Sequence, residues 1–257
     1  MGIKARVAAR VSRTLRHRGI AVSREFGPDL SPETVATIKF VRPYTMTTVQ
    51  RIEAVISGTH HVVKNQIPGA FVESGVWMGG SIMAAARTLV ELGDLERDLY
   101  LYDTFEGLPA PGEHDRIVGS TEHVGGLYAE MNSAAGDKPY LEAPIDLVRA
   151  NVAKTGYPPE RVHAIAGMVE DTIPSTAPDQ VAFLRLDTDW YSSTKVEMET
   201  LFPRLEAGGI LILDDYGYLE GARKAVDEYL ATYPEPMFLH RIDKSGRLAV
   251  KPVDGAR

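Results

Sequence analysis

Short apolar runs alternate with segments of helical periodicity from residue 69 to near the end of the chain. The uninterrupted run Ile210-Leu211-Ile212-Leu213 is typical of a strand buried on both faces of a parallel sheet. The pattern predicts strands at residues 69–76, 99–105, 162–166, 181–187 and 210–213. It predicts helices at residues 79–92, 143–155, 192–205 and 221–232.

Strands that alternate with helices predict an α/β fold, a doubly wound and mostly parallel sheet with helices on both faces. Residues 237–242 and 248–253 are expected to form a closing hairpin, because Asp243-Lys244-Ser245-Gly246 between them is a turn sequence. This hairpin would add one antiparallel edge strand to the sheet.

The segment at residues 25–68 precedes the sheet and has a helical pattern. Ser31 and Pro32 suit the cap and first turn of a helix, and Pro43 interrupts the pattern. One helical face is formed by Val49, Ile52, Val55 and Ile56. We therefore expect an N-terminal helical region at residues 1–68 and an α/β domain at residues 69–257.

Residues 106–140 interrupt the alternation with a stretch rich in glycine, proline and charge. A loop of this length inside a compact domain is usually a lid, a binding loop or disordered. We expect it to lie beside the binding site.

Charge is spread unevenly along the 257 residues, whose net charge is −7. Residues 1–24 hold seven basic residues and no acidic ones, whereas the remainder holds 21 basic and 35 acidic residues, a balance of −14. An acidic body argues against nucleic-acid binding, since phosphate contacts need clustered lysine and arginine. The basic segment is expected to be a surface helix or frayed end, with membrane binding or a transit leader as alternatives.

Composition excludes further classes of function. The chain has no cysteine, which rules out disulfides, thiolate catalysis and zinc–sulfur sites. Its longest apolar run has five residues, Ile82 to Ala86, too short to span a membrane. No signal segment follows the start. We expect a cytoplasmic protein without a membrane partner.

Ligands of a doubly wound sheet bind beyond the carboxyl ends of its strands. The first predicted strand leads into a glycine-rich turn that begins with Glu73, and the second ends in Asp103, which can accept both hydroxyls of a ribose. The Gly-x-Gly-x-x-Gly fingerprint is not met, and Glu73 would repel a pyrophosphate but suits a cationic ligand. A plain strand–turn–helix junction is the alternative.

Four carboxylates follow the last two parallel strands: Asp187, Asp189, Asp214 and Asp215. Their repulsion is costly unless a cation or a proton intervenes. Oxygen ligands favour Mg²⁺, Mn²⁺ or Ca²⁺ over zinc. Helix capping is the alternative, and it explains one acid better than four. No HExxH or Gly-x-Ser-x-Gly motif is present, which argues against a metalloprotease or a serine hydrolase.

Four motifs, Val72–Ser81, Leu101–Gly107, Arg185–Thr194 and Leu213–Gly217, together resemble the macrocin O-methyltransferase family. The similarity also covers Val41–Thr47 and Gly167–Pro174, and it spans about residues 25–250. The resemblance implies a class I methyltransferase, Rossmann-like fold. It also implies transfer of a methyl group from S-adenosylmethionine, with Mg²⁺, to a hydroxyl of a natural product, most often a deoxysugar of a glycosylated antibiotic such as a macrolide. Met78 departs from the pattern, where a basic residue is expected.

The resemblance implies a cofactor site in the loops after the first three strands. Contacts to the methionine part would come from Glu73, Gly75, Val76, Trp77 and Ser81. Asp103 would hold the ribose, with Thr104 and Phe105 beside it, and Gly167 and Met168 would border the adenine.

The resemblance further implies the catalytic residues. Asp187, Asp214 and Asp215 match the metal ligands, and Asp189 matches the general base that takes the proton of the hydroxyl. The acceptor would meet Tyr44, Thr45, Met46, Thr47 and Tyr191, with residues 106–140 forming part of its pocket. A homodimer through the N-terminal helices is implied as well, and a small-molecule glycoside is the implied partner.

Two rival functions have weaker support. Asp187-Thr188-Asp189 resembles the Asp-x-Asp of some Mg²⁺-dependent phosphoryl or glycosyl transferases, but it follows the fourth strand and lacks basic residues for a diphosphate. A non-catalytic cofactor-binding subunit would be expected to lack Asp189. Within methyl transfer, a phenolic, aminocoumarin-type acceptor is the alternative to a sugar.

Overall fold

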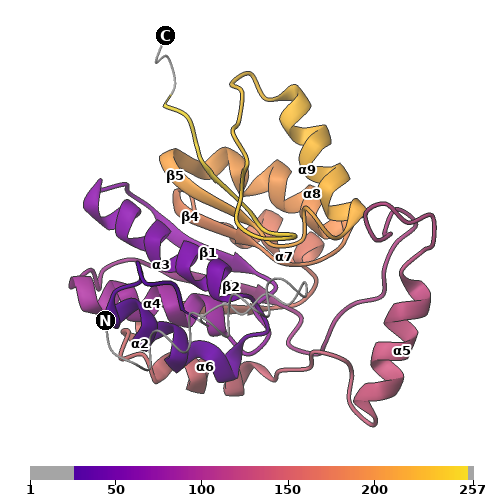
Figure 1. Cartoon of the computed structure of the whole chain (residues 1–257), viewed down its shortest axis with the longest axis horizontal. Coiled ribbons are helices and arrows are strands. Elements are labelled where there is room, and N and C mark those ends of the chain that lie inside the picture. The colour runs from indigo at the N-terminus through magenta and orange to yellow at the C-terminus, as the bar shows by residue number, and fades with distance from the viewer. Residues whose placement is uncertain (1–25, 254–257) are drawn as a thin grey trace, which may run out of the picture. The chain divides into compact units, whose positions relative to one another are not determined.

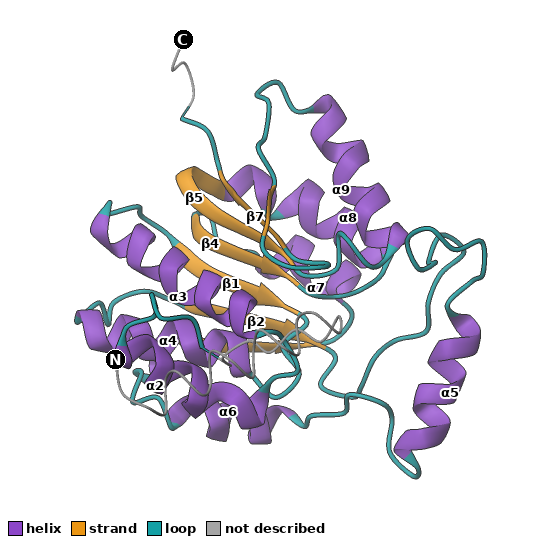
Figure 2. Ribbon diagram, viewed as in Figure 1, coloured by secondary structure: helices purple, strands orange, loops and turns teal. Residues whose placement is uncertain are grey.

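A computed structural model of the protein describes residues 26–253, so the basic segment at residues 1–24 lies outside the described residues. Within this part, seven strands form one sheet (Figure 2). They are β1 (Ala70–Ser74), β2 (Leu99–Asp103), β3 (Val162–Ala166), β4 (Val181–Leu186), β5 (Leu205–Leu213), β6 (His240–Arg241) and β7 (Arg247–Val250).

The strand order is β3-β2-β1-β4-β5-β7-β6, and the first five strands are parallel, as predicted. The closing hairpin is present, but its antiparallel strand β7 lies between β5 and β6 and is not at the edge. The reason is burial, since β7 carries the buried Ala249 while both residues of β6 are exposed. The more apolar strand therefore pairs with the core of the sheet.

Helices cover both faces of the sheet, as Figure 1 shows. Helices α3 (Val49–Lys64), α4 (Gly80–Leu92) and α6 (Ile145–Ala153) pack on one face. On the other face lie α7 (Val169–Thr176), α8 (Tyr191–Thr200) and α9 (Glu220–Thr232). Two helices, α7 and α5 (Gly125–Ala135), were not predicted from the sequence. Short 3₁₀ turns occur at Arg42–Tyr44, Pro159–Arg161 and Phe202–Arg204.

The predicted helix signals near residues 31–56 are confirmed. The Ser31 hydroxyl accepts a hydrogen bond from the Thr34 amide at the start of α2 (Pro32–Val41), and Pro43 lies in the 3₁₀ turn that follows. On α3, Ile52, Val55 and Ile56 are buried. The compact unit that contains the sheet begins at Ala36 and includes α3. A separate role for residues 1–68 stays a prediction.

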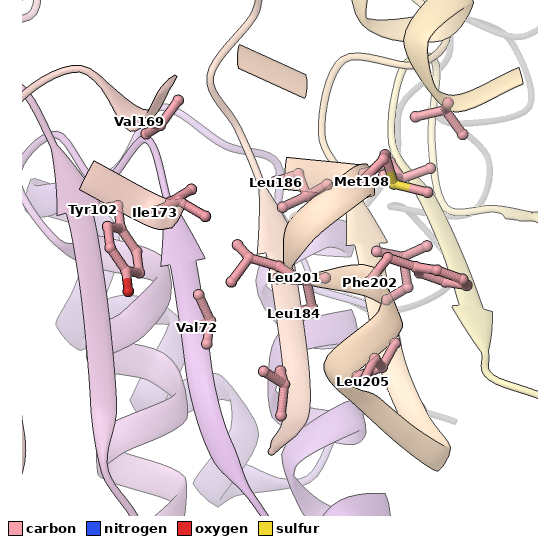
Figure 3. Packing of buried hydrophobic residues seen from close by; sticks show 14 of the residues in the cluster. Val72, Tyr102, Val169, Ile173, Leu184, Leu186, Met198, Leu201, Phe202 and Leu205 are labelled. Carbon is pink, nitrogen blue, oxygen red and sulfur yellow. The ribbon is translucent and has the colours of Figure 1, made fainter. Parts of the chain in front are cut away.

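One buried apolar cluster lies between the sheet and helices α7 and α8. Figure 3 shows Ile173 of α7 and Met198 of α8 directed at side chains of the sheet such as Tyr102 and Leu184. This packing fixes the strand ends from which the functional loops depart. In the described part of the chain, no helix is both long enough and apolar enough to cross a membrane.

Candidate functional site

A cavity of about 530 Å³ lies beyond the carboxyl ends of β1, β2, β4 and β5. It brings together nearly all the residues that the sequence singled out. These are Tyr44, Thr45, Met46, Thr47, Glu73, Gly75, Val76, Trp77, Ser81, Asp103, Thr104, Gly167, Met168, Asp187, Asp189, Asp214 and Asp215.

Phe105 and Tyr191 are the two predicted site residues that do not line the cavity. The Phe105 side chain is buried. The Tyr191 side chain turns toward α9, where its hydroxyl donates to Glu228 at 2.7 Å, and its ring centroid lies 4.5 Å from that of His114. Both residues are neighbours of lining residues in the sequence, but their own side chains do not line the cavity.

The turn between β1 and α4 forms one wall of the cavity. Gly75 has a positive φ of 77°, and a Cβ at this position would clash with the backbone carbonyl of Asp187. Only glycine allows this close approach. The Asp103 carboxylate accepts hydrogen bonds from the amides of Val76 at 2.7 Å and Trp77 at 2.9 Å. Asp103 therefore fixes the shape of the turn that it faces.

The segment Tyr44–Thr47 reaches the cavity by packing on the first turn of α4. A Cβ on Gly80 would lie 2.6 Å from the Tyr44 carbonyl oxygen, so a side chain there would push the segment away. Met46 is 62% exposed at the rim of the cavity. The segment thus lines the cavity, and its contact with an acceptor stays a prediction.

A buried arginine, Arg185, stands at the centre of the carboxylates. Its guanidinium donates to Glu73 at 2.6 Å, to Asp187 at 2.7 Å and to Asp214 at 2.5 Å. No role for Arg185 was predicted from the sequence. The sequence signal that could have identified it is that Arg185 is the single charged residue of the otherwise apolar strand β4, in which every residue is buried. A cation in that position needs several anionic partners.

A second arginine, Arg51 of α3, reaches the same cluster from the side. It forms an ion pair with Asp214 and another with Asp243 at 2.8 Å, in the turn of the closing hairpin. Burial raises the pKa of Asp243, but the Thr48 hydroxyl, the Gly246 amide and Arg51 together lower it to about 2. This interaction, also missed from the sequence, ties the hairpin to the site.

Negative charge remains in excess within the cluster. Its five carboxylates face two guanidinium groups, which leaves an excess of three negative charges when all are ionised. The members of the cluster are Arg51, Glu73, Arg185, Asp187, Asp189, Asp214 and Asp215. Burial first, and then neighbouring carboxylates, raise the pKa of Asp187 and of Asp215 well above the usual range. Burial also raises the pKa of Glu73 to about 7, although Arg185 opposes this. The cluster therefore favours taking up a cation or protons.

The residues present fit a hard divalent cation. Asp187, Asp214 and Asp215 each offer an oxygen, and these atoms lie within 4.8 Å of one another. Among the described residues, the buried Oδ2 of Asp215 has no hydrogen-bond partner. Oxygen donors with an unsatisfied carboxylate are the ligands that Mg²⁺ prefers.

Asp189 lies at a strained position beside this cluster. Its φ of 68° is in the left-handed region, which non-glycine residues seldom adopt. Burial first, and then the neighbouring carboxylates of Asp187 and Asp214, raise the pKa of Asp189 to about 7, although the Asp215 side chain opposes this. The Asp189 side chain also lines the cavity.

One part of the cavity lining, the apolar wall, comes from the chain between β2 and α6. This confirms that residues 106–140 border the cavity, although part of the segment is helical. The side chains of this wall are Leu108, Pro109, Leu127, Tyr128, Met131, Tyr140 and Leu141.

A buried carboxyl behind the site, Glu197 of α8, gives a test of stability. It is 0% exposed, accepts a hydrogen bond from Thr188 at 3.1 Å, and burial raises its pKa from 4.5 to about 8. Its contribution to stability is complete below pH 4.5 and is lost as the pH rises toward 8. The free energy of unfolding of the wild type should therefore fall by up to a few kcal/mol across this range, and Glu197→Gln should not show this fall.

Thermal melting between pH 5 and pH 9 measures this loss, with Glu199→Gln, an exposed residue of the same helix, as the control. The melting temperature of Glu197→Gln should fall less with rising pH than that of the wild type or the control. Equal slopes in all three proteins would show that Glu197 does not titrate in this range.

Comparison with known proteins agrees with this geometry. The family described as macrocin-O-methyltransferase (TylF) matches residues 10–249. A Streptomyces olivaceus protein, 8-demethyl-8-(2,3-dimethoxy-alpha-L-rhamnosyl)-tetracenomycin-C 4'-O-methyltransferase, is 32% identical over 219 residues, which are 85% of this chain and 80% of that protein. Demethyldecarbamoylnovobiocin O-methyltransferase of Streptomyces niveus is 32% identical over 203 residues, which are 79% of this chain and 74% of that protein. The solved structure of the O-methyltransferase NovP has a TM-score of 0.70 and 30% identity, covering 82% of this chain and 83% of that one.

Proposed function

Because the chain belongs to the macrocin-O-methyltransferase family, and so is an S-adenosylmethionine-dependent O-methyltransferase, we propose that its cavity methylates a sugar hydroxyl of a glycosylated natural product with the help of Mg²⁺. One observation carries this proposal. The Asp189 carboxyl and the carboxylates of Asp187, Asp214 and Asp215 lie in the same cavity as the turn between β1 and α4. The proposed base, cation site and cofactor site would thus all be within reach of one acceptor.

The cofactor would lie along the turn between β1 and α4. Glu73, Ser81 and the backbone of Gly75–Trp77 would hold its methionine part, and Asp103 and Thr104 its ribose. Asp103 accepts amide hydrogen bonds at both carboxylate oxygens, which leaves limited capacity for a ribose hydroxyl. Gly167 and Met168 would border the adenine. Phe105 is left out of this assignment because it does not line the cavity.

The protein's own residues would position the acceptor and accept its proton. When bound, S-adenosylmethionine supplies an electrophilic methyl group, and Mg²⁺ held by Asp187, Asp214 and Asp215 polarises hydroxyl oxygens. Asp189 would take the hydroxyl proton, which its raised pKa of about 7 suits near neutral pH. Arg185 holds the Asp187 and Asp214 carboxylates in fixed orientations.

An acceptor with a sizeable apolar part would match the apolar wall of the cavity. Leu108, Leu127 and Met131 offer no charge there, while Thr45 and Thr47, which also line the cavity, offer hydroxyls. The tetracenomycin relative acts, by its name, on a rhamnosyl derivative, which favours a glycoside over a free phenol. A homodimer and a cytoplasmic location stay predictions.

The proposed cofactor site is tested by calorimetric titration with S-adenosylhomocysteine, with and without Mg²⁺. We expect binding in both conditions and its loss in Asp103→Ala, since the turn loses its anchor. Asp137→Ala, at an exposed acid of the loop, serves as the control. Absence of binding to the wild type in either condition would refute the assigned site.

The proposed cation site is tested by titration with Mg²⁺ alone. Asp215→Asn should weaken binding by at least about tenfold, because it removes a charged oxygen ligand. Asp171→Asn, an exposed acid on α7, should leave binding unchanged. Equal affinity in the wild type and Asp215→Asn would exclude Asp215 as a ligand.

A further inference from the structure

We propose that Asp115, in the long loop after β2, is a positioning residue that holds the backbone around Asp189 for proton transfer, an inference that rests on the proposed function. Asp115 is only 1% exposed, although the surrounding loop is rich in glycine, proline and charge. A buried carboxylate in such a loop needs partners. Its partners lie on the segment that carries Asp189.

The Asp115 carboxylate caps helix α8. One of its oxygens accepts a hydrogen bond from the Tyr191 amide at 2.9 Å, and the other from the Gly112 amide at 2.7 Å. Tyr191 is the first residue of α8, and among the described residues Trp190, at the cap position, makes no side-chain capping bond. The free amides of a helix start favour a carboxylate. Asp115 thus supplies from a distant loop the cap that the local sequence lacks.

The capped position lies two residues after Asp189, where the backbone is strained. Asp189 has a φ of 68°, and the Trp190 amide closes a tight turn by donating to the Thr188 carbonyl at 2.8 Å. A non-glycine residue keeps such a conformation only where its surroundings impose it. Asp115 holds the residue after this turn. A second tie from the same loop, from the Trp190 indole to the Pro109 carbonyl at 2.9 Å, holds the turn itself.

The same loop also joins the segment after β5. The Val118 amide donates to the Tyr218 carbonyl, and the Glu220 amide donates to the Arg116 carbonyl, each at 2.8 Å. Asp215 lies just before this segment, and its backbone carbonyl accepts hydrogen bonds from the amides of Tyr218 and Leu219. Residues 109–118 therefore bridge the two strand-end segments that hold Asp189 and Asp215. Loss of the Asp115 tie should displace Asp189 without removing any group that binds cofactor or cation.

The test compares Asp115→Ala, Asp115→Asn and the control Asp137→Ala. Asp115→Ala should lower kcat roughly 10- to 100-fold, with little change in the affinity for S-adenosylhomocysteine, since small misplacements of a reacting group have effects of this size. Asp115→Asn keeps an oxygen for the Tyr191 amide and should retain most of the activity. Unchanged kcat in Asp115→Ala, or equal loss of kcat and cofactor affinity, would overturn the proposal.

A readout without activity separates this inference from the proposed function. Hydrogen exchange of the peptide spanning residues 188–194 should be faster in Asp115→Ala than in the wild type and the control, because α8 loses its cap. Should Asp115→Ala fail to fold, Trp190→Phe, which removes the Pro109 tie and keeps the ring, should show the same two effects. Faster exchange together with a wild type that methylates no glycoside would reject the proposed function alone, while unchanged exchange would reject the role of Asp115.

Discussion

Asp189→Asn is expected to lower the rate of methyl transfer by roughly 10²- to 10⁴-fold, the usual contribution of a general base. An asparagine side chain cannot take the proton of the acceptor hydroxyl. Asparagine tolerates the left-handed backbone found at this position, where φ is 68°, so the fold should be unaffected. The loss should therefore fall on the chemical step.

Single-turnover kinetics with a glycoside acceptor would measure this loss, and calorimetry with S-adenosylhomocysteine and with Mg²⁺ would show whether binding is kept. Asp146→Asn is a suitable control, since Asp146 has a 92% exposed side chain on α6. If Asp189→Asn turned over at the wild-type rate, another group would have to be the base.

Arg185→Met should destabilise the protein by about 3–5 kcal/mol, the usual cost of removing one partner from a buried ionic cluster. The guanidinium contacts Glu73, Asp187 and Asp214, and its loss would leave these carboxylates without their central cation. For a domain of this size the melting temperature should fall by roughly 6–20 °C. The effect should be measured without ligands, so that no added cation substitutes for the arginine.

Arg223→Met is the matched control for this experiment. Arg223 pairs with Asp227 on the surface of α9, where both side chains are about half exposed. An exposed pair of this kind contributes little to stability, so the melting temperature should barely change. A small change in Arg185→Met too would indicate that the buried carboxyls take up protons when the arginine is absent.

Much of the fold could be predicted because buried strands leave a direct trace in the sequence. The run at residues 210–213 and the turn at Asp243–Gly246 both correspond to observed elements. Helix α7 was missed because it has eight residues and contains Pro174. Helix α5 was missed because it begins with two glycines and has no buried residue to produce an apolar period. Both helices depend on tertiary contacts, which the periodicity of the sequence does not show.

The acidic half of the site could be predicted because parallel strands end at a common edge, which places Asp187 beside Asp214 and Asp215. Arg51, which balances part of this charge, and Asp115, which caps α8, could not be predicted. Arg51 belongs to a helix before the sheet and Asp115 to the long loop, so only the folded chain brings them to the site. Tyr191 was expected at the acceptor because of its place in a motif, but the helix it begins directs its side chain toward α9.

The apolar wall of the cavity is formed by one continuous segment of the chain, from Leu108 to Leu141. The groups assigned to the cofactor and the cation lie on other loops. A change of acceptor could therefore arise by exchange of this single segment, as a cassette, without rebuilding the chemical centre. Asp115 sets the limit on such an exchange, because an incoming segment must bring its own cap for α8. Transplants that preserve this anchor are the ones expected to change the acceptor while keeping the site intact.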